Sequence, residues 1–105
     1  MEGSGVDGSR RVCAVEELTD GESVVREVDG TAVAVFSIDG SVYALENVCP
    51  HQGGPLGEGK VEEGCVYCPW HGWQFDVASG EHVHGKATAN AFDVTVEDGD
   101  VYVSL

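Results

Sequence analysis

Short apolar runs joined by Asp-Gly pairs are the feature that most constrains how this chain folds. Two such pairs, Asp39-Gly40 and Asp98-Gly99, each stand between two valine-containing segments. An Asp-Gly pair in this position is the strongest short signal for a β-hairpin, because both residues of the tight turn need a positive φ. The pairs therefore predict two hairpins, with strands over residues 31–38, 41–48, 92–97 and 101–105.

The rest of the chain also favours strands over helices. Valine occurs 18 times, and β-branched side chains suit a pleated sheet better than a helix. No long window keeps the apolar spacing of a helix. Further strands are predicted at residues 11–15, 23–28, 65–67 and 74–77. We expect one all-β domain over residues 11–105, preceded by a flexible leader over residues 1–10.

The charge of the chain limits its partners. It carries 19 Asp and Glu against 5 Lys and Arg, which gives a net charge of −14. Repulsion makes nucleic acid and an acidic membrane surface improbable partners. Two explanations of the acidity stay open: attraction of a partner with a basic face, or solvation of a protein that works in high salt.

The sequence contains no apolar run of the length that a signal peptide or a membrane span needs. We therefore expect a cytoplasmic protein. Thiols stay reduced in that compartment, so the four cysteines are expected to be metal ligands, buried thiols or redox groups rather than two disulfides.

Potential metal ligands are concentrated in one part of the chain. Residues 49–90 hold three of the four cysteines, all four histidines, all three prolines and both tryptophans. Most of this segment shows no strand pattern. It predicts a small ligand-bearing subdomain that is inserted between the strands of the scaffold.

Two short segments supply the donors, Cys49-Pro-His51 and Cys68-Pro-Trp-His71. Two thiolates and two imidazoles can hold one tetrahedral zinc ion. They can also hold a two-iron cluster in which histidines replace two cysteines on one iron. A loop satisfies the Cys-x-His spacing if the two side chains bind different metal atoms, which favours the cluster. A second zinc set remains possible on paper: Cys49, Cys65, Cys68 and His71.

A family resemblance sharpens this choice. The segments Cys49-Pro-His51-Gln-Gly-Gly-Pro-Leu-Gly-Glu-Gly and Cys68-Pro-Trp-His71-Gly-Trp-Gln-Phe-Asp closely resemble the two cluster-binding loops of Rieske iron–sulfur proteins. The resemblance implies a Rieske-type antiparallel β-sandwich, with a small cluster-binding subdomain over about 49–90 inserted between strands. It also implies a [2Fe–2S] cluster. Cys49 and Cys68 would ligate the inner iron, and His51 and His71 the outer iron near the surface.

Three departures from the family pattern concern the surroundings of the cluster. The positions of a disulfide in the high-potential members are Gly54 and Trp70 here, and the positions of a Ser and a Tyr hydroxyl are Trp73 and Phe75. The covering loop, residues 81–93, lacks its usual proline, so its shape is left open. Fewer hydrogen bonds to the cluster and a high negative charge predict a low potential, about −150 mV.

The resemblance further implies the function. We expect a one-electron carrier, not itself an enzyme and monomeric when isolated. It would pass electrons from an NAD(P)H-dependent flavin reductase to a terminal oxygenase. The same loop pattern is similar to the Rieske small subunit of assimilatory nitrite reductases, whose partner is the large subunit. A zinc-stabilised binding module without redox activity is the third alternative.

The remaining notable residues have less specific expectations. Three glycines are expected either to let the backbone approach the cluster or to serve turn geometry: Gly53, Gly54 and Gly72. Cys13 is expected in the core, as is Cys65, and Trp73 and Phe75 are expected to pack near the cluster or in the core. Trp70 could pack or contact a partner. His82 and His84 are expected in a solvated loop, with a role at the cluster or a partner as the alternative.

Overall fold

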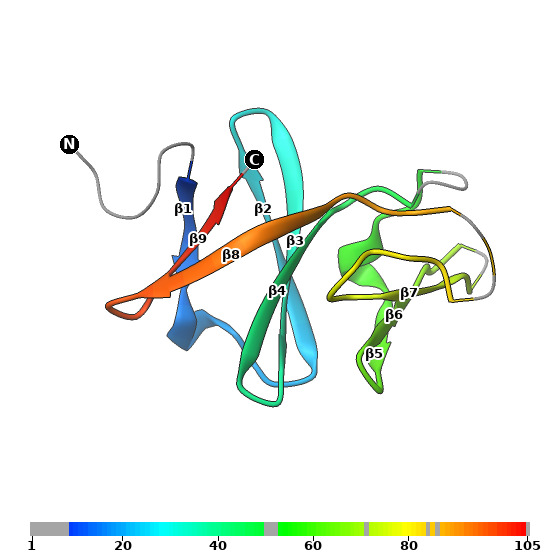
Figure 1. The fold of residues 1–105 in the computed structure, drawn as a ribbon, viewed down its shortest axis with the longest axis horizontal. Coiled ribbons are helices and arrows are strands. Elements are labelled where there is room, and N and C mark those ends of the chain that lie inside the picture. The colour runs from blue at the N-terminus through cyan, green and yellow to red at the C-terminus, as the bar shows by residue number, and fades with distance from the viewer. Residues whose placement is uncertain (1–8, 50–52, 71, 84, 86, 105) are drawn as a thin grey trace.

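The computed structural model describes residues 9–49, 53–70, 72–83, 85 and 87–104, and within them it contains nine strands and no α-helix (Figure 1). The strands are β1 Ser9–Ala14, β2 Glu22–Val28, β3 Thr31–Ile38, β4 Ser41–Glu46, β5 Lys60–Glu62, β6 Cys65–Tyr67, β7 Gln74–Asp76, β8 Ala91–Glu97 and β9 Asp100–Ser104. Two 3₁₀ turns accompany them, η1 Val15–Glu17 and η2 Leu56–Glu58. All strand pairs are antiparallel, so the all-β prediction is confirmed.

Tight turns with two positive φ angles connect the hairpins. The first residue of each turn has φ between 51° and 54°, and the following glycine has φ between 79° and 85°. These values suit the two-residue turn that matches strand twist. The four turns are Asp29-Gly30, Asp39-Gly40, Glu63-Gly64 and Asp98-Gly99. Both predicted hairpins are therefore confirmed, and the structure adds two more.

The structure moves some predicted boundaries. Strand β1 begins at Ser9, where Ser9 pairs with Ser104, so residues 9 and 10 belong to the sheet and not to the leader. Backbone pairing to β9 explains this, because it does not depend on the polar side chains. Residues 1–8 lie outside the described residues. The strand predicted over 41–48 ends at Glu46, and β5 was not predicted.

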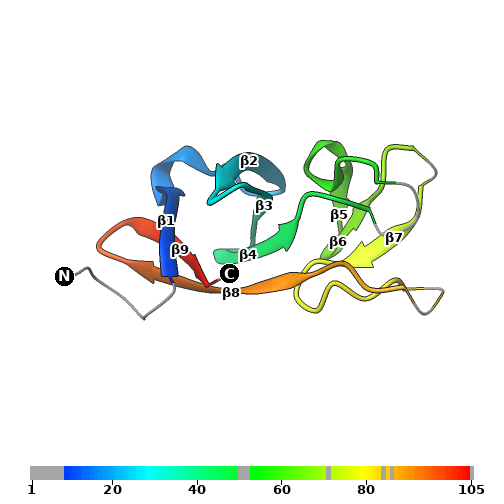
Figure 2. The same ribbon diagram turned by 90° about the horizontal axis from the view of Figure 1, so that it is seen from above.

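The nine strands form two sheets of different size. The larger sheet has the order β1-β9-β8-β4-β3-β2, and the smaller has the order β5-β6-β7. Strand β8 joins the two halves of the larger sheet: Ala91 and Phe92 pair with β4, and the residues from Asp93 onward pair with β9. In the view from above, β5–β7 lie at one end of the molecule and β1 and β9 at the other (Figure 2).

Strand β3 is buried on both faces. Val33 and Val35 belong to a core shared with β1, β4 and β9, whereas Ala34 and Phe36 belong to a second core that extends to β6 and β7. All four side chains are fully buried. A continuous apolar run is typical of a strand buried on both sides. Strand β3 thus separates the core of the larger sheet from the core that contains the predicted ligands Cys49 and Cys68.

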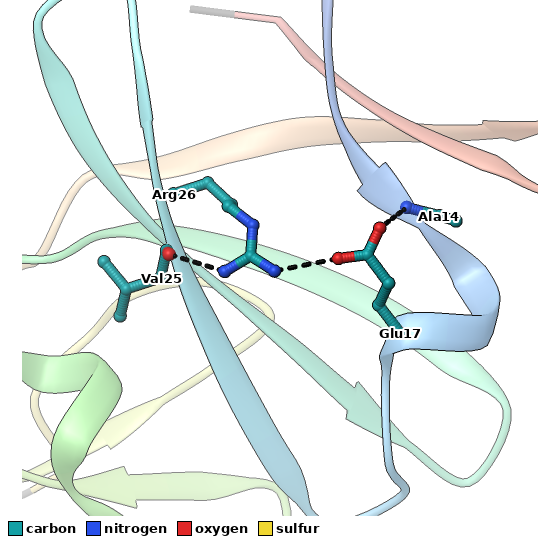
Figure 3. A network of polar contacts seen from close by, with 4 residues as sticks. All are labelled: Ala14, Glu17, Val25 and Arg26. Carbon is teal, nitrogen blue, oxygen red and sulfur yellow. Dashed lines mark hydrogen bonds and ion pairs between the residues drawn. The ribbon is translucent and has the colours of Figure 1, made fainter.

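An exposed polar network ties η1 to β2 (Figure 3). The carboxylate of Glu17 accepts a hydrogen bond from the amide of Ala14 at 2.9 Å and lies 2.8 Å from Nη2 of Arg26. The other terminal nitrogen of Arg26 donates to the carbonyl of Val25. The hydrogen bond from the Ala14 amide, followed by that from Arg26, lowers the pKa of Glu17.

Among the residues described, the chain has no helix that is long and apolar enough to cross a bilayer.

Candidate metal centre

The first predicted ligand loop begins shortly after β4. The amide of Cys49 donates to the carbonyl of Gly54 at 2.8 Å, and the amide of Gly53 donates back to the carbonyl of Cys49 at 2.7 Å. Gly53 has φ +77°, a conformation that side-chain-bearing residues rarely adopt. These contacts fold the chain after Cys49 into a closed loop.

The second loop, after β6, repeats the same pattern. The amide of Cys68 donates to the carbonyl of Trp73 at 2.7 Å, and the amide of Gly72 donates to the carbonyl of Cys68 at 2.8 Å. Gly72 has φ +74°. The fourth residue after each cysteine is therefore a glycine in the left-handed region. Of the two roles expected for Gly53 and Gly72, the structure shows turn geometry.

Gly54 lies at a close approach between the two loops, which is neither of the two roles expected for it. A Cβ built on Gly54 would lie 3.0 Å from Sγ of Cys68 and 3.1 Å from Cγ and Cδ2 of Trp70. The second loop therefore packs directly on the first. Gly54 and Trp70 are the positions matched to the disulfide of the high-potential Rieske members, and they face each other here.

Both predicted cysteine ligands lie at the same end of one core. Cys49 is 1% exposed and Cys68 is 2% exposed, and both belong to the core cluster that also contains Leu56, Val66 and Phe75. Neither forms a disulfide. Two buried thiols on adjoining loops, shielded by apolar side chains, suit thiolate ligation of a metal, because metal binding displaces the thiol proton.

His51 and His71 lie outside the described residues, so their role as ligands stays a prediction. Within the described ranges no three His, Cys, Asp or Glu side chains gather as a metal site. The donor set predicted from the sequence, two cysteines and two histidines, would fit a two-iron cluster with two histidine ligands.

The other two cysteines lie elsewhere. Cys13 is 1% exposed in the valine-rich core of the larger sheet, as predicted, and burial followed by the charge of Glu17 raises its pKa. Cys65 is buried on β6 but does not belong to the core cluster of Cys49 and Cys68. Its neighbour Val66 does, and successive side chains of a strand point to opposite faces. This placement speaks against the zinc set that includes Cys65.

An aromatic stack supports the second loop. The His82 ring lies parallel to Trp73, with 4.3 Å between ring centroids and 2° between planes. Phe75, fully buried, lies 5.2 Å from His82 and 6.4 Å from Trp73. Packing of Trp73 and Phe75 near the site is as predicted. The preferred expectation for His82, a solvated loop residue, was wrong: the ring is half-buried and stacked. His84 lies outside the described residues.

The structure also gives the shape of the proline-free loop over its described residues. It runs back along β7: the amide of Val83 donates to the carbonyl of Gln74, and the amide of His82 to that of Ala87. The amide of Ala89 donates to the carbonyl of Gly80. A Cβ on Gly80 would collide with the carbonyl oxygen of Ala89. Backbone pairing thus holds this loop against the second ligand loop without a proline.

Comparison with known proteins identifies the class. The family model of the Rieske [2Fe–2S] domain matches residues 9–100. The chain is 36% identical to the ferredoxin component of the alkene monooxygenase system of Xanthobacter autotrophicus, over 88% of this chain and 77% of that one. It is also 36% identical to apoptosis-inducing factor 3 of Homo sapiens, of which it spans only 16%.

Solved structures show the same fold. The ferredoxin of carbazole 1,9a-dioxygenase from Nocardioides aromaticivorans IC177 superposes with a TM-score of 0.86 at 30% identity, covering 93% of this chain and 98% of that one. A chain in a complex of reduced oxygenase and oxidised ferredoxin of carbazole 1,9a-dioxygenase gives 0.84 at 28% identity, with 94% of each chain covered. A protein described as a nitrite reductase small subunit gives 0.82 at 25% identity, over 90% and 96%.

The chain belongs to the Rieske [2Fe–2S] family. Its cofactor is accordingly a [2Fe–2S] cluster, and the chain carries electrons rather than catalysing a reaction by itself.

Proposed function

We propose that this protein is the ferredoxin of an oxygenase system. It would take single electrons from an NAD(P)H-dependent flavin reductase and deliver them to a terminal oxygenase. As parts of the same proposal, the protein works in the cytoplasm as a monomer, and its cluster ligands are Cys49, His51, Cys68 and His71.

One observation carries the proposal: two adjoining loops bring the buried thiols of Cys49 and Cys68 next to the exposed Trp70. Relatives that match along most of both lengths are ferredoxin components, such as those of the alkene monooxygenase and anthranilate 1,2-dioxygenase systems. A carrier needs a redox centre near its surface. The loop of Cys68 meets this requirement, because Trp70 within it is 55% exposed.

The chain's own residues have distinct roles in this proposal. The cluster supplies a reversible one-electron centre whose histidine ligands raise its potential above that of an all-cysteine cluster. The buried Cys49 and Cys68 hold the centre on the apolar core, where Leu56 and Phe75 keep water from the thiolates. The repeated loop hydrogen bonds fix both cysteines before and after electron transfer, which keeps structural change small.

The ligand assignment is tested by metal analysis of single variants. Replacing Cys49, His51, Cys68 or His71 with Ala should abolish or disrupt the cluster spectrum. Cys65→Ala and Cys13→Ala are matched controls, which should keep about two iron and two acid-labile sulfide per chain. Stoichiometric zinc without sulfide would support the zinc module and contradict the proposal.

The role as a carrier is tested by reconstitution. The purified holoprotein, a flavin reductase with NAD(P)H and an oxygenase component should show oxygenase turnover that depends on this protein. Cys68→Ala should remove that dependence, and Cys65→Ala should not. Reduction by the reductase without delivery to any oxygenase would contradict the assignment of the acceptor.

The nitrite reductase alternative has one supporting observation, the fold match at 25% identity to a protein described as that enzyme's small subunit. It differs from the first proposal in association. A fixed subunit would co-purify with a large subunit and elute with it in size-exclusion chromatography, whereas a carrier would elute alone.

A further inference from the structure

Two side chains that precede the first ligand loop hold the 3₁₀ turn η2, which follows that loop. Oδ1 of Asn47 accepts a hydrogen bond from the backbone amide of Gly57 at 2.5 Å. Oγ of Ser23, on β2, donates to the carbonyl of Gly57, also at 2.5 Å. All three residues are partly buried. We call these two hydrogen bonds the clamp, because they bind both backbone groups of one residue.

Asn47 is itself fixed to the larger sheet. It follows Glu46, the last residue of β4, and its backbone amide donates to the carbonyl of Ala32 in β3 at 2.8 Å. Its side chain bonds to Gly57, ten residues further along the chain, and the ligand loop that begins at Cys49 lies between these two positions. Asn47 therefore closes this loop against β3, which is buried on both faces.

The packing at Gly57 leaves η2 little room to move. A Cβ built on Gly57 would collide with Cγ2 of Val25. It would also lie 3.0 Å from Oδ1 of Asn47 and 3.2 Å from Cβ of Ala34. The turn η2 thus packs directly on β2 and β3, between the larger sheet and β5–β7 (Figure 1). Leu56, the residue before Gly57, is fully buried in the core that contains both predicted cysteine ligands, so a shift of η2 would disturb that core.

The two ligand loops are supported in different ways. The second is braced by the stack of His82 on Trp73. The bonds within the first close only the turn from Cys49 to Gly54, and the clamp attaches that turn to the scaffold. Gly54 packs against Sγ of Cys68. Displacement of the first loop would therefore change how the two thiols lie relative to each other.

We propose that Asn47 is the positioning residue of the first ligand loop: through the amide of Gly57 it fixes the place of Cys49 relative to Cys68. The inference rests on the proposed ligation by these two cysteines and deepens it. Groups that hold metal ligands in place keep the geometry of a redox centre the same before and after electron transfer. Asparagine supplies the acceptor oxygen without adding a charge to a chain that already has 19 Asp and Glu.

The rate of iron release measures how firmly the loops hold the cluster. The holoprotein is mixed with dithionite and an excess of the ferrous chelator bathophenanthroline disulfonate. Asn47→Ala should release iron about tenfold faster, the effect of losing one hydrogen bond of about 1.4 kcal/mol. The matched control is Asn90→Ala, because the chain's other asparagine makes an exposed side-chain bond to Glu46. It should change the rate less than about twofold. Equal rates in Asn47→Ala and the unaltered protein would overturn the proposal.

The conservative variant Asn47→Asp separates positioning from general stability. It keeps an acceptor oxygen for the Gly57 amide, so iron release should return to within about twofold of the unaltered rate. The EPR spectrum of the reduced cluster should be broadened in Asn47→Ala and restored in Asn47→Asp. General destabilisation would speed release without changing the spectrum of the molecules that still hold the cluster, and that result would refute the positioning role. Failure of Asn47→Asp to slow the release would refute it as well.

Ser23→Ala removes the other bond of the clamp and provides the test if Asn47→Ala folds poorly. It should also speed iron release. Because both side chains act through Gly57, the two substitutions combined should accelerate release by less than the product of their separate effects. Effects that multiply in full would show that the side chains act independently, which contradicts the clamp.

Hydrogen exchange distinguishes failure of this inference from failure of the ligand assignment. The Gly57 amide, in a peptide over residues 53–60, should exchange about tenfold faster in Asn47→Ala than in the unaltered protein, and unchanged exchange would refute the clamp. A chain without iron and sulfide would refute the proposed ligation, while this exchange would still report the clamp. A cluster with the same release rate and EPR spectrum in Asn47→Ala would refute only the positioning role.

Discussion

Removal of the His82 ring should loosen the second ligand loop. The ring is stacked on Trp73 at 4.3 Å and 2°, and the carbonyl of Trp73 accepts the amide of Cys68 at 2.7 Å. An aromatic pair of this kind contributes about 0.5–1.5 kcal/mol beyond the burial of its area. At about 1.4 kcal/mol per factor of ten, His82→Ala should make local opening of this loop about 2 to 12 times more frequent.

Hydrogen exchange measured by mass spectrometry checks this prediction. A peptide that begins at Cys65 and ends at Trp73 should exchange faster in His82→Ala by that factor, because the amides of Cys68 and Gly72 are protected by the loop's hydrogen bonds. His82→Phe keeps an aromatic ring and should restore the slow exchange. A peptide from β3 serves as the internal control. Unchanged exchange over residues 65–73, or the same acceleration in His82→Phe, would show that the stack does not hold the loop.

Three further predictions concern the backbone and two titrating groups. Gly72→Ala puts a side chain at φ +74° and should lower the free energy of unfolding, measured by urea titration, by about 1–2 kcal/mol. An equal loss in the control Ser41→Ala, at an exposed strand position, would contradict this reason. Burial, and then the charge of Glu17, raise the pKa of Cys13 above its ordinary 9.0. Because the thiol loses its proton first in the unfolded chain, the free energy of unfolding should fall as the pH rises above 9.0, and it should fall less in Cys13→Val. The amide of Ala14, and then Arg26, lower the pKa of Glu17. The carboxylate therefore stabilises the fold above the ordinary carboxylate range, and this stabilisation is lost as the pH falls through the lowered pKa. Glu17→Gln should make the melting temperature fall less steeply with decreasing pH in the acid range.

The scaffold was largely predictable from the sequence because its signals are local. The Asp-Gly pairs fix hairpin turns by their positive φ, whatever the rest of the chain does. The sequence predicted a strand at β3, but not its burial on both faces. That burial depends on tertiary packing, since Ala34 and Phe36 face a second core to which β6 and β7 contribute. Strand β5 has only three residues and a largely polar sequence, so its existence depends on pairing with β6.

Those residues of the site whose type is fixed by metal-binding chemistry could be predicted from the sequence. Contacts that depend on tertiary packing could not. Thiolate and imidazole donors mark Cys49 and Cys68 in the sequence, and the structure places both at one end of a core. Gly54 and Trp70, the positions matched to the disulfide of the high-potential members, lie close together in the structure. No sequence pattern pairs His82 with Trp73. The two residues lie before and after β7 in the chain, and their contact depends on the path of an irregular loop. A histidine in a loop of mostly polar residues looks the same in the sequence whether its ring is solvated or stacked.

The same core makes a specific prediction for the redox potential. Phe75 is fully buried in the cluster of side chains that contains both cysteines, and Trp73 packs against it. These positions resemble those of the Tyr and Ser hydroxyls in high-potential Rieske members, and neither residue here carries a hydroxyl. With the missing disulfide and the −14 net charge, we expect a midpoint near the low end of the Rieske range, about −150 mV at pH 7.

Phe75→Tyr tests the cause of this low potential. A hydroxyl that donates to a cluster sulfide stabilises the added electron by about 1.5–3 kcal/mol, which raises the midpoint by about 60–130 mV for one electron. Phe36→Tyr adds the same group to the same core from β3, away from the matched position, and should leave the potential unchanged. Protein-film voltammetry measures all three proteins. A midpoint well above zero in the unaltered protein would mean that other donors replace the missing hydroxyls. An equal shift in both variants would mean that core polarity, rather than a bond from position 75, sets the potential.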